Sequence, residues 1–150
     1  QNTPAYYRKK KEALQKLIRK NALIKLKVVK NDEFEQGERK LLNFGHTVGH
    51  AIETIHNLPH GYAISLGMVF AASLSEQLLN FKKKNEVIDL LKQYHLPVNY
   101  SLNTEEIKNR IFMDKKRAGN EMSFVLLEKT GKAAIQKISV TQLQKYITAY

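Results

Sequence analysis

Three histidines and two glycines lie close together in one segment of the chain, a grouping typical of a metal or anion site. His46 and His50 are four residues apart, so on an α-helix their imidazoles project from one face and can converge on a single ion or anion. His60 follows Pro59, where a turn can fold a third imidazole back toward the first two. Neutral imidazole is the commonest side-chain ligand for zinc-type metals. From the residues alone, His46 and His50 are the preferred ligand pair.

The residues around the histidines add two further signals. Gly45 and Gly49 cost a helix roughly 1 kcal/mol each relative to alanine, which indicates that something approaches the backbone closely there. Arg39 and Asn43 lie one to two turns before the histidines on the expected helix, adding a planar anion-binding fork and an amide. The segment therefore predicts a metal beside an anion-binding group.

The apolar pattern predicts a mainly α chain, folded as a single domain over residues 1–150, with a small β-hairpin near its end. The helix expected over 61–81 is apolar around most of its circumference and carries several small residues, so it should be the buried central helix. One or two helices are expected over 4–29, and the other expected helices cover 41–55, 85–94, 103–113 and 140–150. The hairpin strands are expected over 124–128 and 132–138 around a glycine turn.

The composition limits the classes of partner. The chain has no cysteine, which excludes disulfides and thiolate metal sites, so any metal is bound through nitrogen and oxygen. The net charge of +11 raises the alternative of a basic module that binds nucleic acid. The densest basic runs, residues 8–11 and 82–84, contain no interleaved aromatic residues, so we assign them to solvated surface and predict no nucleic-acid partner. No apolar run approaches the roughly 20 residues of a membrane span, so we predict no membrane partner and a cytoplasmic location.

Several motifs in fixed order extend the histidine segment over nearly the whole chain. They are Lys25-Leu26-Lys27-Val28-Val29, then Asp32-Glu33-Phe34-Glu35-Gln36-Gly37-Glu38-Arg39, then Leu42-Asn43-Phe44-Gly45-His46-Thr47-Val48-Gly49-His50-Ala51-Ile52-Glu53, then His60-Gly61-Tyr62-Ala63-Ile64, and last Met113-Asp114-Lys115-Lys116 before Phe124-Val125-Leu126-Leu127. In these motifs the chain resembles the 3-dehydroquinate synthases. Two positions depart from the family pattern, because Tyr62 replaces an acidic residue and Leu26 replaces an alanine.

The resemblance implies an enzyme of the shikimate pathway, a carbon–oxygen lyase that depends on NAD and on Zn²⁺ or Co²⁺. It would convert 3-deoxy-arabino-heptulosonate 7-phosphate into 3-dehydroquinate and phosphate. Complete family members are more than twice as long, and their amino-terminal domain holds NAD and contributes a glutamate as the third metal ligand. We therefore expect this chain to be the helical carboxy-terminal domain of a longer enzyme and to be inactive by itself. The resemblance leaves open whether the chain forms a homodimer.

The resemblance also implies a role for each candidate residue. It makes His46 and His60 the metal ligands of this domain and His50 a contact near the substrate phosphate, unlike the His46–His50 pair that spacing alone suggests. Two interpretations of Glu53 stay open: it accepts a hydrogen bond from a histidine, or it is an ordinary residue on the helix surface. The predicted substrate contacts are Lys25, Arg39, Asn43, His50, Lys115 and Lys116, of which the first four are also predicted to be catalytic.

Two other functions stay open at this point. Another sugar-phosphate cyclase or a metal-dependent polyol dehydrogenase of the same superfamily would share the architecture, whereas the nucleic-acid-binding module would share only the basic charge. Arg39, Asn43 and the Asp114-Lys115-Lys116 motif favour dehydroquinate synthase, because they suit a substrate that carries both a carboxylate and a phosphate.

Overall fold

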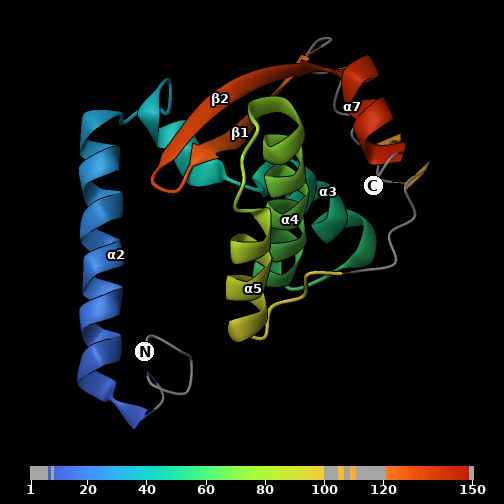
Figure 1. The fold of residues 1–150 in the computed structure, drawn as a ribbon. Helices are drawn as coiled ribbons and strands as arrows, with labels where there is room; N and C mark the ends of the chain where they lie inside the picture. The colour runs from blue at the N-terminus through green and yellow to red at the C-terminus, as the bar shows by residue number, and fades with distance from the viewer. Residues whose placement is uncertain (1–6, 8, 100–104, 107–108, 111–120, 149–150) are drawn as a thin grey trace.

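Helices form most of the described structure, and one antiparallel hairpin lies near its end. The computed structural model describes residues 7, 9–99, 105–106, 109–110 and 121–148 (Figure 1). The prediction of a mainly α chain with a late hairpin is confirmed. Its elements are α2 (Lys11–Asn31), the 3-10 helix η1 (Glu38–Asn43), α3 (His46–His56), α4 (His60–Leu79), α5 (Lys84–Gln93), β1 (Glu121–Lys129), β2 (Lys132–Ser139) and α7 (Val140–Thr148). In the stretch expected to form one or two helices, 4–29, Lys10 is not helical and α2 begins at Lys11. Residues 4–6 and 8, and most of the helix expected over 103–113, lie outside the described residues.

Helix α4 is the central helix, as its apolar circumference predicts. It packs against α3, α5 and β1, and residues on all its sides are buried. With 20 residues it is long and apolar enough to cross a membrane, which corrects the prediction that no apolar run approaches that length. Because 67% of its most apolar stretch is buried inside the protein, packing accounts for that composition.

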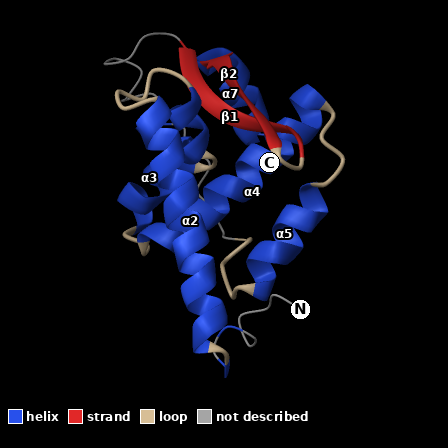
Figure 2. Cartoon of the chain, turned by 90° about the vertical axis from the view of Figure 1, so that its left-hand side faces the viewer, coloured by secondary structure: helices blue, strands red, loops and turns tan. Residues whose placement is uncertain are grey.

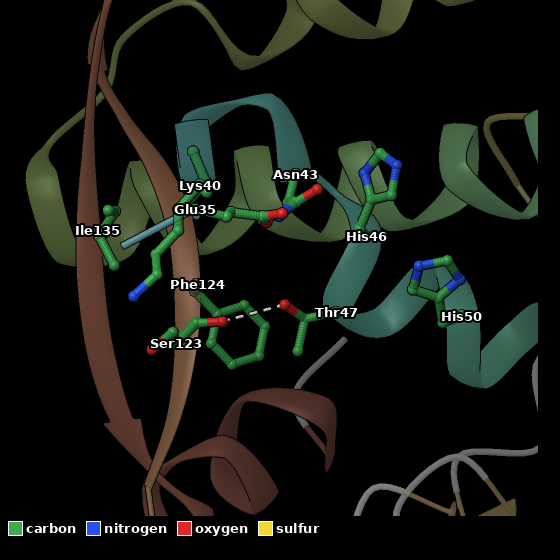
Figure 3. A pocket seen from close by; sticks show the side chains of 10 residues that line it. Glu35, Lys40, Asn43, His46, Thr47, His50, Ser123, Phe124 and Ile135 are labelled. Atoms are coloured by element: carbon green, nitrogen blue, oxygen red, sulfur yellow. Dashed lines mark hydrogen bonds between the residues drawn. The ribbon is translucent and has the colours of Figure 1, made fainter. Parts of the chain in front are cut away.

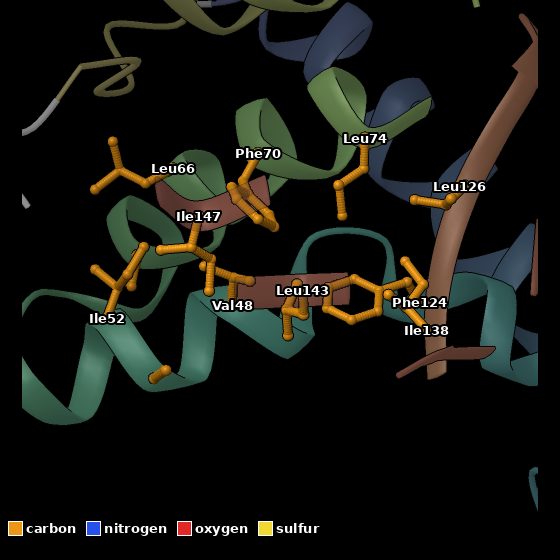
Figure 4. Close-up of a cluster of buried hydrophobic side chains, with 12 residues drawn as sticks. Val48, Ile52, Leu66, Phe70, Leu74, Phe124, Leu126, Ile138, Leu143 and Ile147 are labelled. Atoms are coloured by element: carbon orange, nitrogen blue, oxygen red, sulfur yellow. The ribbon is translucent and has the colours of Figure 1, made fainter. Parts of the chain in front are cut away.

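The hydrophobic core forms where α3, α4, the hairpin and α7 meet. Figure 2 shows the hairpin lying across one end of the helices, with α7 beside it. The side chains that fill this space come from all four elements (Figure 4), so the hairpin and α7 complete the core of the helical layer. They are Val48, Ala51, Ile52, Ala63, Leu66, Phe70, Leu74, Phe124, Leu126, Ile138, Leu143 and Ile147.

The glycines predicted to allow a close approach lie where α3 meets α4. A Cβ atom built on Gly67 of α4 would lie 2.0 Å from the carbonyl oxygen of Gly45 and 2.7 Å from the nitrogen of Gly49. A Cβ on Gly45 itself would lie 2.6 Å from the nitrogen of Met68. The two backbones therefore touch, and the partner that the sequence left unspecified is α4.

The expected helix over 41–55 is wrong at its beginning. Residues up to Asn43 form the separate 3-10 helix η1, and α3 begins only at His46. Gly45 between them has φ +81°, a left-handed conformation that interrupts the right-handed helix and that glycine adopts at little cost. Arg39 and Asn43 consequently do not lie on a stripe of the histidine helix.

Ser75 ties the central helix to the hairpin from a fully buried position. Its hydroxyl donates to the carbonyl oxygen of Ala71 and accepts from the backbone N–H of Leu127 at 2.9 Å. Ser73, two residues earlier, donates only within α4, to the oxygen of Val69 at 3.1 Å.

We expect Ser75→Ala to lower the free energy of unfolding by about 1–2 kcal/mol, because the Leu127 N–H loses this acceptor in a dry environment. Urea denaturation of the variant measures the change. Ser73→Ala is the matched control and should change stability by less than about 0.5 kcal/mol, since among the described residues its hydroxyl bonds within α4 and to no other element. Equal losses in the two variants would contradict a bridging role for Ser75.

Helix α2 lies along one side of the molecule and meets the rest chiefly through η1 (Figure 1). None of its residues is buried, although Ile18, Leu23, Ile24 and Leu26 are large and apolar. These four side chains are 50–60% exposed. The helix therefore presents apolar surface that the described residues do not cover.

Candidate metal and anion site

The three histidines predicted from the sequence lie together at the facing ends of two helices. His46 and His50 occupy the first and second turns of α3, and His60 is the first residue of α4. Asn57, with φ +50°, ends α3 and lets the chain turn back through Pro59. The ring centres of His46, His50 and His60 are 5.4, 5.7 and 5.6 Å apart in pairs. The fold thus brings all three imidazoles into one cluster.

The separation of each pair of rings is compatible with two imidazoles on one metal ion. A zinc–nitrogen bond of about 2.0–2.1 Å places the ion about 3.2 Å from the centre of its imidazole ring, so two rings bound to one tetrahedral ion would have centres about 5.2 Å apart. The observed separations exceed that value by a few tenths of an ångström. Nitrogen donors on an exposed edge of the protein also suit zinc or cobalt, which accept imidazole ligands.

Each of these imidazoles has its Nδ1 atom next to a protein oxygen. Nδ1 of His50 lies 3.1 Å from the Glu53 carboxylate, and Nδ1 of His60 lies 3.2 Å from both oxygens of the same carboxylate. Nδ1 of His46 lies 3.2 Å from the carbonyl oxygen of Phe44. The hydrogen bond from His50, followed in strength by the one from His60, lowers the pKa of the Glu53 carboxyl below its ordinary value. His50, Glu53 and His60 also form a group whose possible metal-binding atoms all lie within 4.8 Å of one another.

A pocket of about 340 Å³ opens beside His46 and His50, between η1, α3 and the hairpin (Figure 3). One wall is polar and comes from the loop, η1 and α3, whereas the other is largely apolar and comes from the two strands. The Thr47 hydroxyl donates to the carbonyl oxygen of Ser123 at 3.0 Å and so joins the two walls (Figure 3). The lining residues are Glu35, Lys40, Asn43, His46, Thr47, His50, Ser123, Phe124, Val125 and Ile135.

Asp32 organises the loop that carries the polar wall. Its carboxylate accepts the backbone N–H groups of Arg39 at 3.0 Å, Gln36 at 2.9 Å and Gly37 at 2.8 Å. The N–H of Arg39 is the strongest influence that holds the pKa of Asp32 below its ordinary value. A carboxylate at the end of α2 therefore fixes where η1 begins.

Glu35 is a pocket residue to which the sequence analysis assigned no role. It accepts a hydrogen bond from the side-chain amide of Asn43, and its carboxylate lies 3.8 Å from Nε of Arg39. Its φ of +55° is unusual for a residue with a side chain, and such strain clusters at functional sites. The available signal was its place four residues before Arg39 inside the acidic motif. Lys40 and Thr47, which also line the pocket, carried no such signal.

The remaining predicted residues divide into two groups. Among the described residues, Arg39 and Lys25 do not line this pocket: Arg39 donates from Nη1 to the carbonyl oxygen of Glu33 at 2.5 Å, and Lys25 lies on the exposed surface of α2. Lys115 and Lys116 lie outside the described residues. The site as described therefore gathers His46, His50, His60 and Asn43 of the predicted set.

Comparison with known protein families gives a consistent match. The family model described as 3-dehydroquinate synthase C-terminal matches residues 1–117. A relative from Dichelobacter nodosus (strain VCS1703A), named 3-dehydroquinate synthase, is 41% identical over 99% of this chain and 42% of its own length. Relatives of the same name from Clostridium beijerinckii and Pyrococcus abyssi are 39% and 36% identical over 85% and 81% of this chain, and 38% and 37% of their own lengths. The chain therefore spans about two fifths of the length of these relatives.

Solved structures share the fold at lower sequence identity. A 2-deoxy-scyllo-inosose synthase complexed with carbaglucose-6-phosphate, NAD⁺ and Co²⁺ has a TM-score of 0.77 at 22% identity, covering 92% of this chain and 41% of that one. A 2-epi-5-epi-valiolone synthase from Streptomyces hygroscopicus subsp. jinggangensis 5008, with NAD⁺ and Zn²⁺ bound, has a TM-score of 0.76 at 20% identity, covering 92% and 39%. At these identities the likeness establishes the fold alone.

Proposed function

The chain belongs to the 3-dehydroquinate synthase family, and on that premise we propose that it is the metal- and substrate-binding part of a 3-dehydroquinate synthase. The complete enzyme would convert 3-deoxy-arabino-heptulosonate 7-phosphate into 3-dehydroquinate and phosphate, as a carbon–oxygen lyase of the shikimate pathway. The observation that carries the proposal is the cluster of His46, His50 and His60 beside a polar pocket, in a chain whose sequence relatives carry that name.

We favour this function over that of another sugar-phosphate cyclase because of the two levels of similarity. The named synthases are 36–42% identical to this chain, whereas the cyclases that share its fold are 20–22% identical. The higher sequence identity to the named synthases is stronger support for a shared function than a shared fold is, because one fold hosts many functions. It is also stronger support than net charge, which is the observation behind a nucleic-acid-binding role.

The donor set fits a divalent ion, and His46 and His60 are the proposed ligands. When bound, Zn²⁺ or Co²⁺ would supply a Lewis acid that polarises the substrate hydroxyl oxidised by NAD. His50 lies next to both ligands and can hold a phosphate oxygen or exchange a proton with it. The Asn43 amide, held by Glu35, faces the same pocket and can hydrogen bond to substrate hydroxyl groups.

A further part of the enzyme is needed for the complete reaction. Two imidazoles fill half of a tetrahedral metal shell, so we propose that the amino-terminal part of the full-length enzyme supplies a glutamate ligand and most of the NAD site. The exposed apolar residues of α2, namely Ile18, Leu23, Ile24 and Leu26, offer a surface for that part to cover. Lys25 lies on the same helix and would then reach the substrate from the interface. A homodimer is compatible with this arrangement.

Metal titration by calorimetry tests the proposed ligand set. We expect the 150-residue chain to bind Zn²⁺ and Co²⁺ weakly, and His46→Ala and His60→Ala to lower the affinity at least about tenfold, because each variant removes half of the available ligands. His50→Ala is the matched control and should keep most of the affinity. Loss of binding in His50→Ala, with retention in His46→Ala, would instead make His50 and His60 the ligand pair.

A further inference from the structure

A single carboxylate lies between two of the three clustered histidines. Glu53 is one turn after His50 on α3, and the start of α4 brings His60 to its other side. The three Nδ1–oxygen contacts are 3.1, 3.2 and 3.2 Å, all within hydrogen-bonding range. The side chain of Glu53 is 32% exposed, compared with 59% for His50 and 55% for His60. The carboxylate thus lies on the inner side of both rings.

A carboxylate in this position fixes which ring nitrogen carries the proton. An ionised carboxylate only accepts hydrogen bonds, so a neutral imidazole beside it keeps its proton on Nδ1 and leaves Nε2 with a free lone pair. Histidines that bind metals nearly always donate their other ring N–H to a carboxylate or a backbone carbonyl in this way. His46 follows the same pattern with the carbonyl oxygen of Phe44.

We propose that Glu53 is a positioning residue shared by His50 and His60: it holds both neutral rings as the Nδ1–H tautomer, so that His60 presents the Nε2 lone pair to the metal and His50 presents Nε2 to the substrate, where it takes up a proton and, once protonated, donates a hydrogen bond to an anionic oxygen. The inference rests on the proposed function for the identity of the two partners, the metal at His60 and the substrate at His50. It assigns the metal-binding half and the anion-binding half of the site to one supporting side chain. Loss of Glu53 therefore disturbs both halves at once.

The competing role for Glu53 is that of a metal ligand, because one of its oxygens and one nitrogen each of His50 and His60 lie within 4.8 Å of one another. In that arrangement the ion would bind Nδ1 of His50 and Nδ1 of His60, and His46 would be excluded from the site. The carbonyl contact of His46 argues against it, because Nδ1 of all three rings then lies next to an oxygen and Nε2 is the nitrogen left for another partner in each ring. The ring centres of His46 and His60 are also 5.7 Å apart, which keeps His46 within reach of an ion that His60 binds.

The tautomers of the metal-free chain test the inference directly. In the ¹⁵N-labelled protein, at a pH where the imidazoles are neutral, two-bond nitrogen–proton correlation spectra distinguish the two tautomers. We expect His50 and His60 to show the Nδ1–H form in the wild type and to shift toward the Nε2–H form in Glu53→Ala. Glu53→Gln should shift less, because its amide oxygen still accepts one hydrogen bond. Glu86→Ala, which removes an equal charge from α5, is the control and should leave both tautomers unchanged.

Metal binding by the same variants provides the second measurement. We expect Zn²⁺ affinity to fall about 10–100-fold in Glu53→Ala and less in Glu53→Gln, with the Co²⁺ absorption spectrum keeping its band positions at saturation. Unchanged tautomers in Glu53→Ala would overturn the inference, as would a changed Co²⁺ spectrum, which would make Glu53 a ligand. If the wild type binds no metal, the proposed metal role fails, while the tautomers still decide whether Glu53 positions the two rings.

Discussion

Gly67→Ala should destabilise the chain by about 3 kcal/mol or more, at the upper end of the range for overpacked positions. The added methyl would lie 2.0 Å from the carbonyl oxygen of Gly45 and 2.7 Å from the nitrogen of Gly49. Both are backbone atoms, so no side-chain rotation can relieve the clash, and α3 must move away from α4. Because His46 follows Gly45 directly, the same movement would displace the first histidine of the site.

Urea denaturation followed by circular dichroism measures this loss. The matched control is Gly61→Ala in the first turn of the same helix, where an added Cβ meets no atom of the described residues within 4 Å. The control should gain about 0.5 kcal/mol, because alanine favours the helix and restricts the unfolded chain. A Gly67→Ala protein as stable as the control would show that α3 and α4 do not pack as closely as described.

The 150-residue chain alone should release no phosphate from 3-deoxy-arabino-heptulosonate 7-phosphate, even with NAD and Zn²⁺ or Co²⁺ in excess. The reason is that the chain spans about two fifths of the length of its named relatives and supplies two of the proposed metal ligands. A reaction that needs a hydride carrier and a metal held in fixed geometry loses most of its rate when either is mispositioned.

A phosphate-release assay measures this result, with the full-length relative from Dichelobacter nodosus as the positive control. Fusing the amino-terminal part of that relative to this chain should restore activity, since the missing ligand and the nucleotide site would then be present. Turnover by the unfused chain would contradict the proposed division of the active site between two parts of the enzyme. Failure of the fusion alone, with weak metal binding retained, would point to mismatched interfaces at α2.

The helices, the hairpin and the types of possible metal ligand follow from the amino-acid sequence alone. His46 and His50 lie one turn apart on α3 because helical spacing depends on the chain alone, and Asn57 and Pro59 mark the end of that helix. The apolar circumference of α4 predicted its burial, and the Lys129–Gly131 turn predicted the hairpin. The absence of cysteine limited any metal site to nitrogen and oxygen ligands.

Which of these residues come into contact depends on how the elements pack in three dimensions. The position of η1 depends on three backbone N–H groups that converge on Asp32, and no periodic pattern reveals that loop. The placement of Glu53 between His50 and His60 depends on how α4 returns against α3 at Gly67. Sequence patterns record one face of one element at a time, whereas these contacts join residues through the packing of two elements. The three histidines could therefore be predicted as candidate metal ligands, whereas the contact of His50 and His60 with one carboxylate could not be predicted from either helix alone.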